Sequence, residues 1–135
     1  MTSKALRLID ANFNRAKEGL RVCEDILRFV FDDHALTARF KELRHDCSKI
    51  LIQFPVPYRA LVAKRNSARD VGKQSFVRDK KPGWSDLLIS NMKRVQESLR
   101  VLEESSKIIA SQKSKRFQTL RFRLYELEKR VLKKF

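Results

Sequence analysis

Four stretches of apolar residues, spaced by alternating steps of three and four positions, restrict what this chain can fold into. Such spacing places the apolar side chains on one face of an α-helix. It occurs over residues 6–30, 36–54, 88–109 and 117–131. The 135 residues include only three glycines and three prolines, too few for a turn-rich β-fold. The sequence therefore predicts an all-α protein.

The spacing also predicts which side chains form the core. The predicted core positions are Leu6, Ile9, Phe13, Ala16, Leu20, Cys23, Leu27, Val30, Leu36, Phe40, Leu43, Cys47, Ile50, Phe54, Leu88, Met92, Val95, Leu99, Leu102, Ile109, Phe117, Leu120, Leu124, Leu127 and Val131. Both cysteines fall among them, so we expect small reduced core residues and no disulfide.

Capping residues predict where the helices begin and end. Ser3, Ser85 and Ser114 are expected N-caps of the first, third and fourth helices, because their hydroxyls accept from exposed backbone N–H groups. The "FDDH" turn at residues 31–34 should separate the first two helices and cap the second. The second helix should end before "PVP" at residues 55–57, because proline disfavours helix at the preceding residue.

One charged block occurs twice along the chain. The pattern Asn-x-x-Arg-x-x-Glu-x-Leu-Arg-Val-x-Glu begins at Asn12 and again at Asn91, 79 residues later. A weaker repeat relates residues 40–44 to 117–121 at an offset of 77. The sequence predicts one domain, an antiparallel four-helix bundle built from a duplicated αα-hairpin. The first hairpin would span about residues 3–53, the linker 54–84 and the second hairpin 85–135.

The linker is long enough to suggest a function. Loops of this length are uncommon in compact domains unless they bind a ligand or cover a site. "PYRALVAKR" at residues 57–65 should form a short helix, and turns should follow it. Gly72 is expected to supply a positive φ or a close backbone approach to a ligand. Asp70 is a candidate metal ligand or base, and a turn aspartate bonding its own backbone is the alternative.

The repeated charges have two interpretations. Arg15, Glu18 and Arg21 follow each other at steps of three, which rotate by about −60° around a helix, so they form a ladder that spirals over the surface. Alternatively the two copies face each other and bind phosphate, because arginine gives bidentate, charge-assisted hydrogen bonds. The survival of the charges in both copies raises binding to about equal standing with the surface ladder, and both interpretations stay open. No metal site is evident from the spacing of cysteine and histidine.

The positive net charge limits the expected binding partners to anionic molecules but does not select one class of them. The net charge is +15 and the pI is near 10.3, which favours anionic partners such as nucleic acid or phosphorylated small molecules. No apolar run is long enough for a membrane span and no leader is evident, so we expect a cytoplasmic protein without a membrane partner. The sequence contains neither a P-loop nor a G-x-G-x-x-G motif. Nucleotide chemistry would therefore need a site made from helix side chains.

Five segments resemble the helical domain found at the N-terminus of some bacterial thiamine-phosphate synthases. They are "RLIDANFNRAKEGLRVCEDILRFVFDD", "LTARFKELRHD", "RNSARDVG", "NMKRVQESLRVLEE" and "FQTLRFRLYELEK". The resemblance covers nearly the whole chain in the same order. It implies thiamine biosynthesis and an alternative hydroxymethylpyrimidine phosphate kinase, with a phosphorylated pyrimidine and a nucleoside triphosphate such as ATP as ligands. If a nucleotide is used, we expect Mg²⁺ with it. The chain ends where the synthase barrel would begin, so we expect no synthase activity.

The resemblance also selects candidate site residues, whose roles we assign from their chemistry. Asp70, Glu18 and Glu97 are the candidate catalytic carboxylates. The candidate phosphate- and substrate-binding residues are Asn12, Arg15, Arg21, Arg44, His45, Arg65, Gly72, Asn91, Arg94, Arg100, Arg121 and Tyr125, with Glu24 and Glu103 matching the same blocks. The competing interpretation is a basic helical module that binds RNA or an acidic protein surface. Docking onto a separate thiamine-phosphate synthase chain and homo-oligomer formation are further alternatives.

Overall fold

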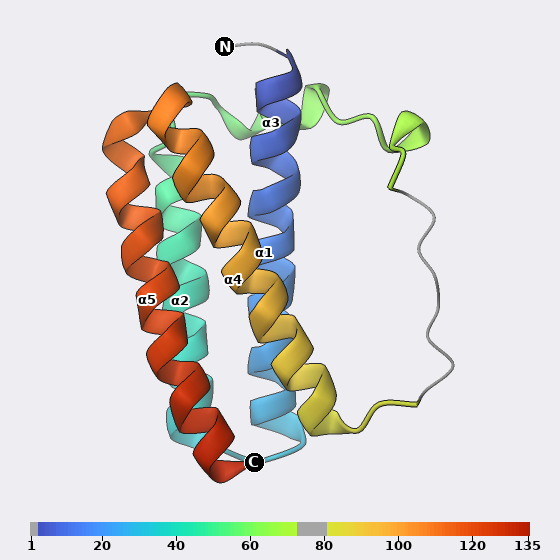
Figure 1. Ribbon diagram of the computed structural model, residues 1–135, viewed down its shortest axis with the longest axis vertical. Helices are drawn as coiled ribbons and strands as arrows, with labels where there is room; N and C mark the ends of the chain where they lie inside the picture. Colours follow the sequence, from blue (N-terminus) through green and yellow to red (C-terminus); the bar gives the residue numbers. More distant parts are fainter. Residues whose placement is uncertain (1–2, 73–80) are drawn as a thin grey trace.

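The part of the chain that the computed structural model describes, residues 3–72 and 81–135, consists of α-helices joined by short turns and a linker (Figure 1). Its elements are α1 (Ser3–Phe29), α2 (His34–Ile52), α3 (Tyr58–Ala63), the 3₁₀-helix η1 (Ser67–Arg69), α4 (Trp84–Ile109) and α5 (Ser111–Lys134). These residues contain no strand. The predicted all-α bundle is confirmed.

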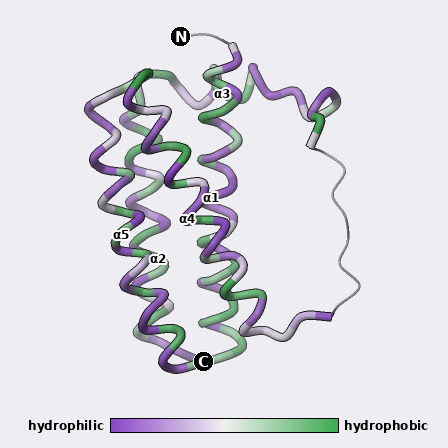
Figure 2. Tube along the Cα trace, viewed as in Figure 1, coloured by the Kyte–Doolittle hydropathy of each residue, from purple (hydrophilic) through white to green (hydrophobic). Residues whose placement is uncertain are grey.

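The four long helices form a ring in which each helix packs against two neighbours. α1 contacts α2 and α4, and α5 contacts α4 and α2. Figure 1 shows α4 crossing α1 at an angle, with the two helices running in opposite directions. Hydrophobic and hydrophilic residues alternate along each long helix in Figure 2, as expected when one face of each helix is buried.

Nearly all the predicted core positions are buried. The exceptions lie at the ends of their helices. Val30 follows the last residue of α1 and is exposed, and Ile109, the last residue of α4, is only partly buried. The apolar spacing runs one residue beyond α1. The helix ends at Phe29, because the chain then turns through Asp32, which has a φ of 51°.

Of the four predicted caps, two are wrong and one is confirmed. Ser3 is the first residue of α1, and the position before it lies outside the described residues, so that cap stays a prediction. The Asp33 carboxylate accepts from the Leu36 backbone N–H at 3.0 Å and caps α2. Gly83, not Ser85, precedes α4, and the Asp86 carboxylate accepts from the Gly83 N–H at 3.0 Å. α5 begins at Ser111, directly after Ala110, so Ser114 lies inside the helix. The Ser114 hydroxyl instead donates to the Glu103 carbonyl at 3.0 Å, which ties α5 back to α4.

The linker closes one end of the bundle. Phe54 and Leu61 are buried, and α3 packs on α1, which bears out the short helix expected from "PYRALVAKR". The prediction of a positive φ at Gly72 is wrong, since no described glycine has one. The Gly72 N–H instead donates to the Asp70 carboxylate at 2.9 Å, which is the turn alternative for Asp70. The turns expected over residues 73–80 lie outside the described residues.

Gly19 allows the close crossing of α1 and α4. A Cβ atom at this position would lie 2.5 Å from the Val95 Cγ2 and 3.3 Å from the Asn91 carbonyl oxygen. Contacts of 2.5 Å do not occur between real side chains, so a larger residue must move the two helices apart. The glycine is therefore required here by packing rather than by backbone conformation.

Replacing Gly19 by alanine is expected to lower the free energy of unfolding. The overpacking should cost about 1–3 kcal/mol, and the better helix propensity of alanine returns about 1 kcal/mol at most. Urea unfolding followed by circular dichroism measures the difference. Gly72→Ala is the matched control, because only the Asp70 carboxylate, at 3.5 Å, lies near its added Cβ. Equal or greater stability of Gly19→Ala would show that the crossing is not tight.

Candidate functional site

The asparagines that open the two repeated blocks both bond to their own helix. The Asn12 side-chain N–H donates to the Leu8 carbonyl at 2.9 Å, and that of Asn91 donates to the Leu87 carbonyl at 2.8 Å. The donor and the acceptor of the second bond each lie 79 residues after those of the first, so the two bonds are equivalent in the repeat. The Asn12 Oδ1 is buried and has no hydrogen-bond donor among the described residues.

The glutamates that close the two blocks hold an arginine of the next helix. Glu24 on α1 accepts from the Arg44 Nε and NH2 at 2.7 and 3.2 Å. Glu103 on α4 accepts from the Arg121 NH2 with both oxygens, at 3.0 and 3.2 Å. Each ion pair joins the two helices of one hairpin. The common origin of the two hairpins stays a prediction.

These ion pairs account for four more of the predicted site residues. Arg21 lies 3.8 Å from the Glu24 carboxylate, and Arg100 lies 3.5 Å from that of Glu103. The pKa of Arg44 is raised because Glu24 accepts its hydrogen bonds. The pKa of Arg121 is also raised, first by its hydrogen bond with the Tyr125 hydroxyl at 3.0 Å and then by Glu103. Arg44 and Arg121 therefore serve first to hold the helices together.

The side chains of the central Arg and Glu of each block make no hydrogen bond or ion pair with any other described residue. They are Arg15 and Glu18 on α1, and Arg94 and Glu97 on α4, and all four are exposed. The repeated block thus contains two kinds of charge. Its closing glutamates are buried in ion pairs, and its central charges are free to bind a ligand.

Arg15 lines a hollow of about 440 Å³ between α1 and the linker, which we call the linker hollow. Arg65 forms its far wall and donates to the buried Asp10 carboxylate through Nε and NH2, at 2.8 and 2.7 Å. The full lining is Lys4, Arg7, Leu8, Asp10, Ala11, Asn12, Asn14, Arg15, Arg65, Asn66, Ser67 and Asp70. Four of the predicted site residues, Asn12, Arg15, Arg65 and Asp70, therefore meet in one place.

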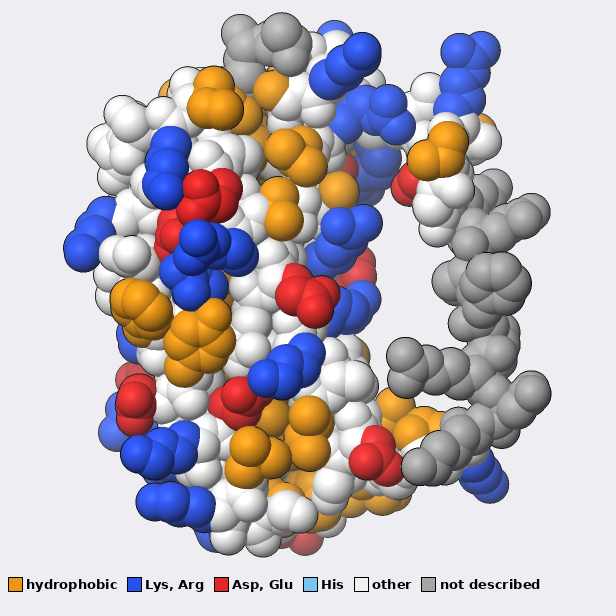
Figure 3. Space-filling model, viewed as in Figure 1, with side chains coloured by type: hydrophobic (Ala, Val, Ile, Leu, Met, Phe, Trp, Pro, Cys, Tyr) orange, Lys and Arg blue, Asp and Glu red, His pale blue; other side chains and the backbone are white. Residues whose placement is uncertain are grey.

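The linker hollow carries an excess of positive charge. Its two carboxylates are already bonded, Asp10 to Arg65 and Asp70 to the Gly72 N–H. Lys4, Arg7 and Arg15 have no ion-pair partner in the described part of the chain. Figure 3 shows Lys and Arg side chains gathered along the margin of the bundle that faces the linker. Three unpaired cations around a concave surface favour binding of a phosphate group.

Arg94 and Glu97 line a second concave surface on the outer side of α4. It consists of two adjoining hollows of about 460 and 410 Å³ that share Lys93 and Glu97, and we call the pair the α4 groove. Its other lining residues are Asp86, Ile89, Ser90, Gln96, Arg100 and Tyr125. The Arg94 Nε lies 3.9 Å from the position of a Cβ on Gly19, so Arg94 reaches across to α1.

Eight of the fifteen predicted site residues line one of two neighbouring regions. The other seven, Glu18, Arg21, Arg44, His45, Gly72, Asn91 and Arg121, line neither. Arg15 and Arg65 lie in the linker hollow, and Arg94 lies in the α4 groove. The two regions approach each other at Gly19, which is one helical turn after Arg15. His45 lies apart from both, exposed on α2, and Gly72 lines neither of them.

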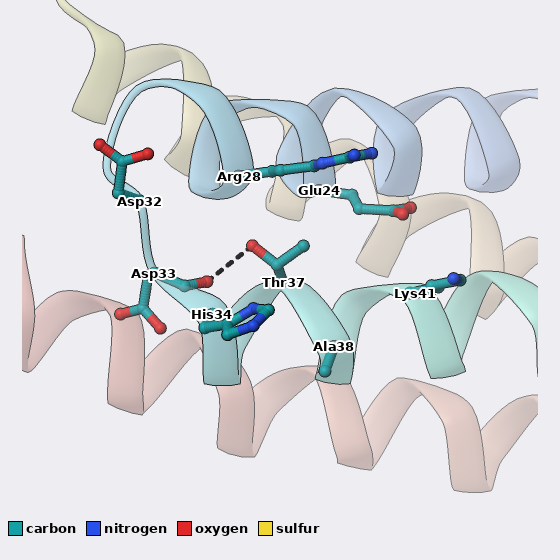
Figure 4. A pocket seen from close by; sticks show the side chains of 8 residues that line it. All are labelled: Glu24, Arg28, Asp32, Asp33, His34, Thr37, Ala38 and Lys41. Carbon is teal, nitrogen blue, oxygen red and sulfur yellow. Dashed lines mark hydrogen bonds between the residues drawn. The ribbon is translucent and has the colours of Figure 1, made fainter.

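A hollow of about 600 Å³ lies between α1 and α2 (Figure 4), and two of its carboxylates are already paired. It is lined by Glu24, Arg28, Asp32, Asp33, His34, Thr37, Ala38 and Lys41. Glu24 is paired with Arg44, and the pKa of Asp33 is lowered by Lys134 and then by the Leu36 N–H. The Asp33 carbonyl also accepts from the Thr37 hydroxyl at 2.6 Å. Glu24 and Asp33 are thus engaged in ion pairs, whereas Arg28, Asp32 and Lys41 have no ion-pair partner among the described residues.

Metal ions and thiol chemistry find little support in the described residues. Within residues 3–72 and 81–135, no three His, Cys, Asp or Glu side chains are grouped so as to hold a metal ion. Burial raises the pKa of both Cys23 and Cys47 to about 12, so their thiols stay protonated. None of the described helices is long and apolar enough to span a membrane.

Sequence reasoning missed three charged residues that line the linker hollow. Lys4, Arg7 and Asp10 lie outside the repeated block and were therefore not selected. A signal was present, because Lys4 and Arg15 are 11 residues apart and so lie on the same face of a helix. The partner of Asp10 could not be inferred, because Arg65 is 55 residues away along the chain.

Comparison with known proteins supports the resemblance. Residues 7–130 match the ThiD2 family. The thiamine-phosphate synthases of Thermosynechococcus vestitus, Rhodopirellula baltica and Synechocystis sp. are 38%, 34% and 36% identical over 90%, 89% and 93% of this chain. The matches cover 34%, 32% and 36% of those proteins, so the chain spans about a third of their length. No solved structure matches the chain. The chain belongs to the ThiD2 family.

Proposed function

We propose that the chain acts in thiamine biosynthesis by binding a hydroxymethylpyrimidine phosphate in the linker hollow and phosphorylating it. The observation that carries the proposal is the set of unpaired cations Lys4, Arg7 and Arg15 around a hollow whose carboxylates are already bonded. The relatives, which are thiamine-phosphate synthases, support the pathway. The phosphate would lie against Arg15, with Arg65 held in place by Asp10.

The other lining residues suit a small ring. Leu8 is partly exposed and lies with Ala11 on the wall of the hollow, so the two offer apolar contact to a pyrimidine. Asn12 borders the same hollow with a buried Oδ1 that lacks a donor. A ring amino group would donate a hydrogen bond to this oxygen once the Asn12 side chain turned toward the hollow.

The proposed reaction needs positioning and charge neutralisation more than a base. An oxygen of the pyrimidine monophosphate attacks the γ-phosphorus of a nucleoside triphosphate, and the bond from that phosphorus to the β,γ-bridging oxygen breaks. The attacking oxygen is largely ionised at neutral pH, since the second pKa of a phosphate monoester is about 6. Arginine and lysine would stabilise the charge on the transferred group.

The three candidate carboxylates then have a role other than proton removal. A nucleotide-bound Mg²⁺ takes most of its ligands from phosphates and water and needs only one or two carboxylates. Glu18 and Glu97 are exposed and have no ion-pair partner among the described residues, and Glu97 lines the α4 groove, which suits that role. Asp70 bonds the Gly72 N–H and would position the linker.

Calorimetric titration with hydroxymethylpyrimidine monophosphate tests the binding step. Arg15→Ala should weaken the affinity by about 10- to 100-fold, because it removes one or more charge-assisted bonds to phosphate. Chromatographic detection of the pyrimidine diphosphate, with ATP and Mg²⁺ present, tests the transfer step.

Arg39→Ala is the matched control for this titration. Arg39 is an exposed arginine on α2 whose ion pair with Glu42 is also exposed, and it lines neither the linker hollow nor the α4 groove. Its affinity for the pyrimidine should equal that of the wild type. No binding by the wild type, or equal affinities for Arg15→Ala and Arg39→Ala, would refute the proposal.

A second candidate function rests on the positive charge. A net charge of +15 would also support binding to RNA. Affinity for RNA that falls by several powers of ten between low and moderate salt, together with no binding of the pyrimidine, would favour this alternative. Docking onto a thiamine-phosphate synthase chain is compatible with either function, and co-purification of the two chains tests it.

A further inference from the structure

Two aromatic rings are exposed side by side on the outer face of α5. Phe122 and Tyr125 are 52% and 39% exposed, and their ring centroids lie 6.0 Å apart. The Arg121 guanidinium lies 5.0 Å from the centroid of the Phe122 ring and 5.6 Å from that of Tyr125. Exposed aromatic side chains are unfavourable in water, so a pair of them suggests a binding surface.

The ion pair between Arg44 and Glu24 in the first hairpin forms without a phenylalanine or tyrosine ring at the positions equivalent to Phe122 and Tyr125. The offset of 77 pairs Phe122 with His45 and Tyr125 with Ser48. Arg44 is nevertheless held by Glu24 through two hydrogen bonds in the first hairpin. Phe122 and Tyr125 are therefore not required to keep an arginine on a buried glutamate.

Tyr125 is held in place at a cost to the second ion pair. Arg44 binds Glu24 through both Nε and NH2, whereas Arg121 binds Glu103 through NH2 alone and turns NH1 to the Tyr125 hydroxyl. The Arg121 Nε is left buried without a hydrogen-bond partner among the described residues. An unsatisfied buried N–H is unfavourable, so Arg121 bonds the Tyr125 hydroxyl at the expense of a second N–H bond to Glu103.

The α4 groove begins at Tyr125 and continues along charged side chains. Arg100 lies at the Tyr125 end, Lys93 belongs to both hollows, and Arg94 lies at the end near Gly19. The combined surface offers the Tyr125 ring at one end and three cations along its length. Lys93 is paired with Glu128 at 3.2 Å and Arg100 with Glu104 at 3.1 Å, whereas Arg94 has no ion-pair partner among the described residues. Its far end lies one helical turn from Arg15 and the linker hollow.

We propose that the α4 groove binds a nucleoside triphosphate. The base stacks on Tyr125 beside Phe122, because a heteroaromatic ring stacks well on tyrosine whatever the base. The phosphates extend past Arg100 and Lys93 toward Arg94, which brings the γ-phosphate near Gly19. This assignment rests on the proposed function, since it supplies the group that is transferred to the pyrimidine monophosphate in the linker hollow.

Titration with a non-hydrolysable β,γ-imido analogue of ATP, with Mg²⁺, tests the groove. Tyr125→Ala should weaken the affinity for the analogue by about 10-fold, the usual effect of losing one stacking ring. Phe122→Ala should weaken it less, because the Phe122 ring lies beside that of Tyr125 but lines neither hollow of the groove. Tyr125→Phe should keep the affinity, because the ring remains. The affinity for the pyrimidine monophosphate should stay unchanged in all three variants.

Phe29→Ala is the control for the loss of an exposed ring. Phe29 is 65% exposed, and the Arg28 guanidinium lies over its ring at 4.7 Å, but it lines neither the groove nor the linker hollow. Its affinity for the analogue should match that of the wild type.

The outcomes separate this assignment from the proposed function. Suppose that the ring variants bind the analogue as tightly as the wild type, while the wild type still forms the pyrimidine diphosphate. The assignment of the nucleotide to the α4 groove is then wrong, and the proposed kinase function stands. If the wild type neither binds the analogue nor forms the diphosphate, both are wrong. Weakened analogue binding in the ring variants alone supports the groove.

Discussion

Replacing Arg121 by methionine should lower the free energy of unfolding by about 3–5 kcal/mol, which corresponds to a fall in Tm of roughly 10 °C or more. The side chains of Arg121 and Glu103 are only 8% and 5% exposed. Methionine leaves the buried Glu103 carboxylate with only the exposed Arg100 guanidinium, at 3.5 Å, and no buried cation. Removing one partner of a buried ion pair is strongly destabilising. Urea and thermal unfolding followed by circular dichroism measure the loss.

The first hairpin supplies the matched variant. The Arg44 side chain is 20% exposed, so water can reach Glu24 more readily after Arg44→Met, and the loss should be smaller. The double variant Glu103→Leu, Arg121→Met should recover much of the lost stability, since it leaves no buried charge unpaired. A loss below about 1 kcal/mol for Arg121→Met would mean that the Glu103 carboxylate is well hydrated without its partner.

Replacing Phe13 by alanine should be about as destabilising, with an expected loss of about 3–5 kcal/mol. Phe13 is almost fully buried on α1. Its ring meets those of Phe54 and Phe117 edge-on, with centroid distances of 5.8 and 5.5 Å. The cavity left by alanine would loosen the contact of α1 with both α5 and the segment that follows α2.

The same unfolding experiment on Phe29→Ala provides the comparison. That ring is 65% exposed, so its removal should change the stability by about 0.5 kcal/mol at most. Equal losses for Phe13→Ala and Phe29→Ala would contradict the described core.

The fold was predictable because the apolar spacing is regular. Steps of three and four along residues 6–30 and 117–131 can be satisfied only by helices that bury one face, and burial is what the chain gains most from. The errors fall at helix ends. Ser114 failed as a cap because the last turn of α4 reaches almost to α5, so its hydroxyl bonds the Glu103 carbonyl. Such ends depend on tertiary contacts that no local pattern contains.

The candidate site was predictable only in part. The repeated block selects Arg15 and Arg94, which have no partner among the described residues, and also Arg44 and Arg121, which are bound to Glu24 and Glu103. The sequence could not separate the two kinds, because the bound arginines meet glutamates about 20 residues away on another helix. Likewise, nothing local indicated that Asp10 would hold Arg65.

The antiparallel crossing at Gly19 has a consequence for how one motif can serve two ligands. Arg15 and Arg94 hold matching places in the repeated block, yet the linker borders the first, whereas Tyr125 of α5 lines the groove of the second. In the proposed reaction, Arg15 would hold the acceptor and Arg94 the donor. The two helices would thus divide between them the roles that a single copy of the block could not perform on both substrates at once.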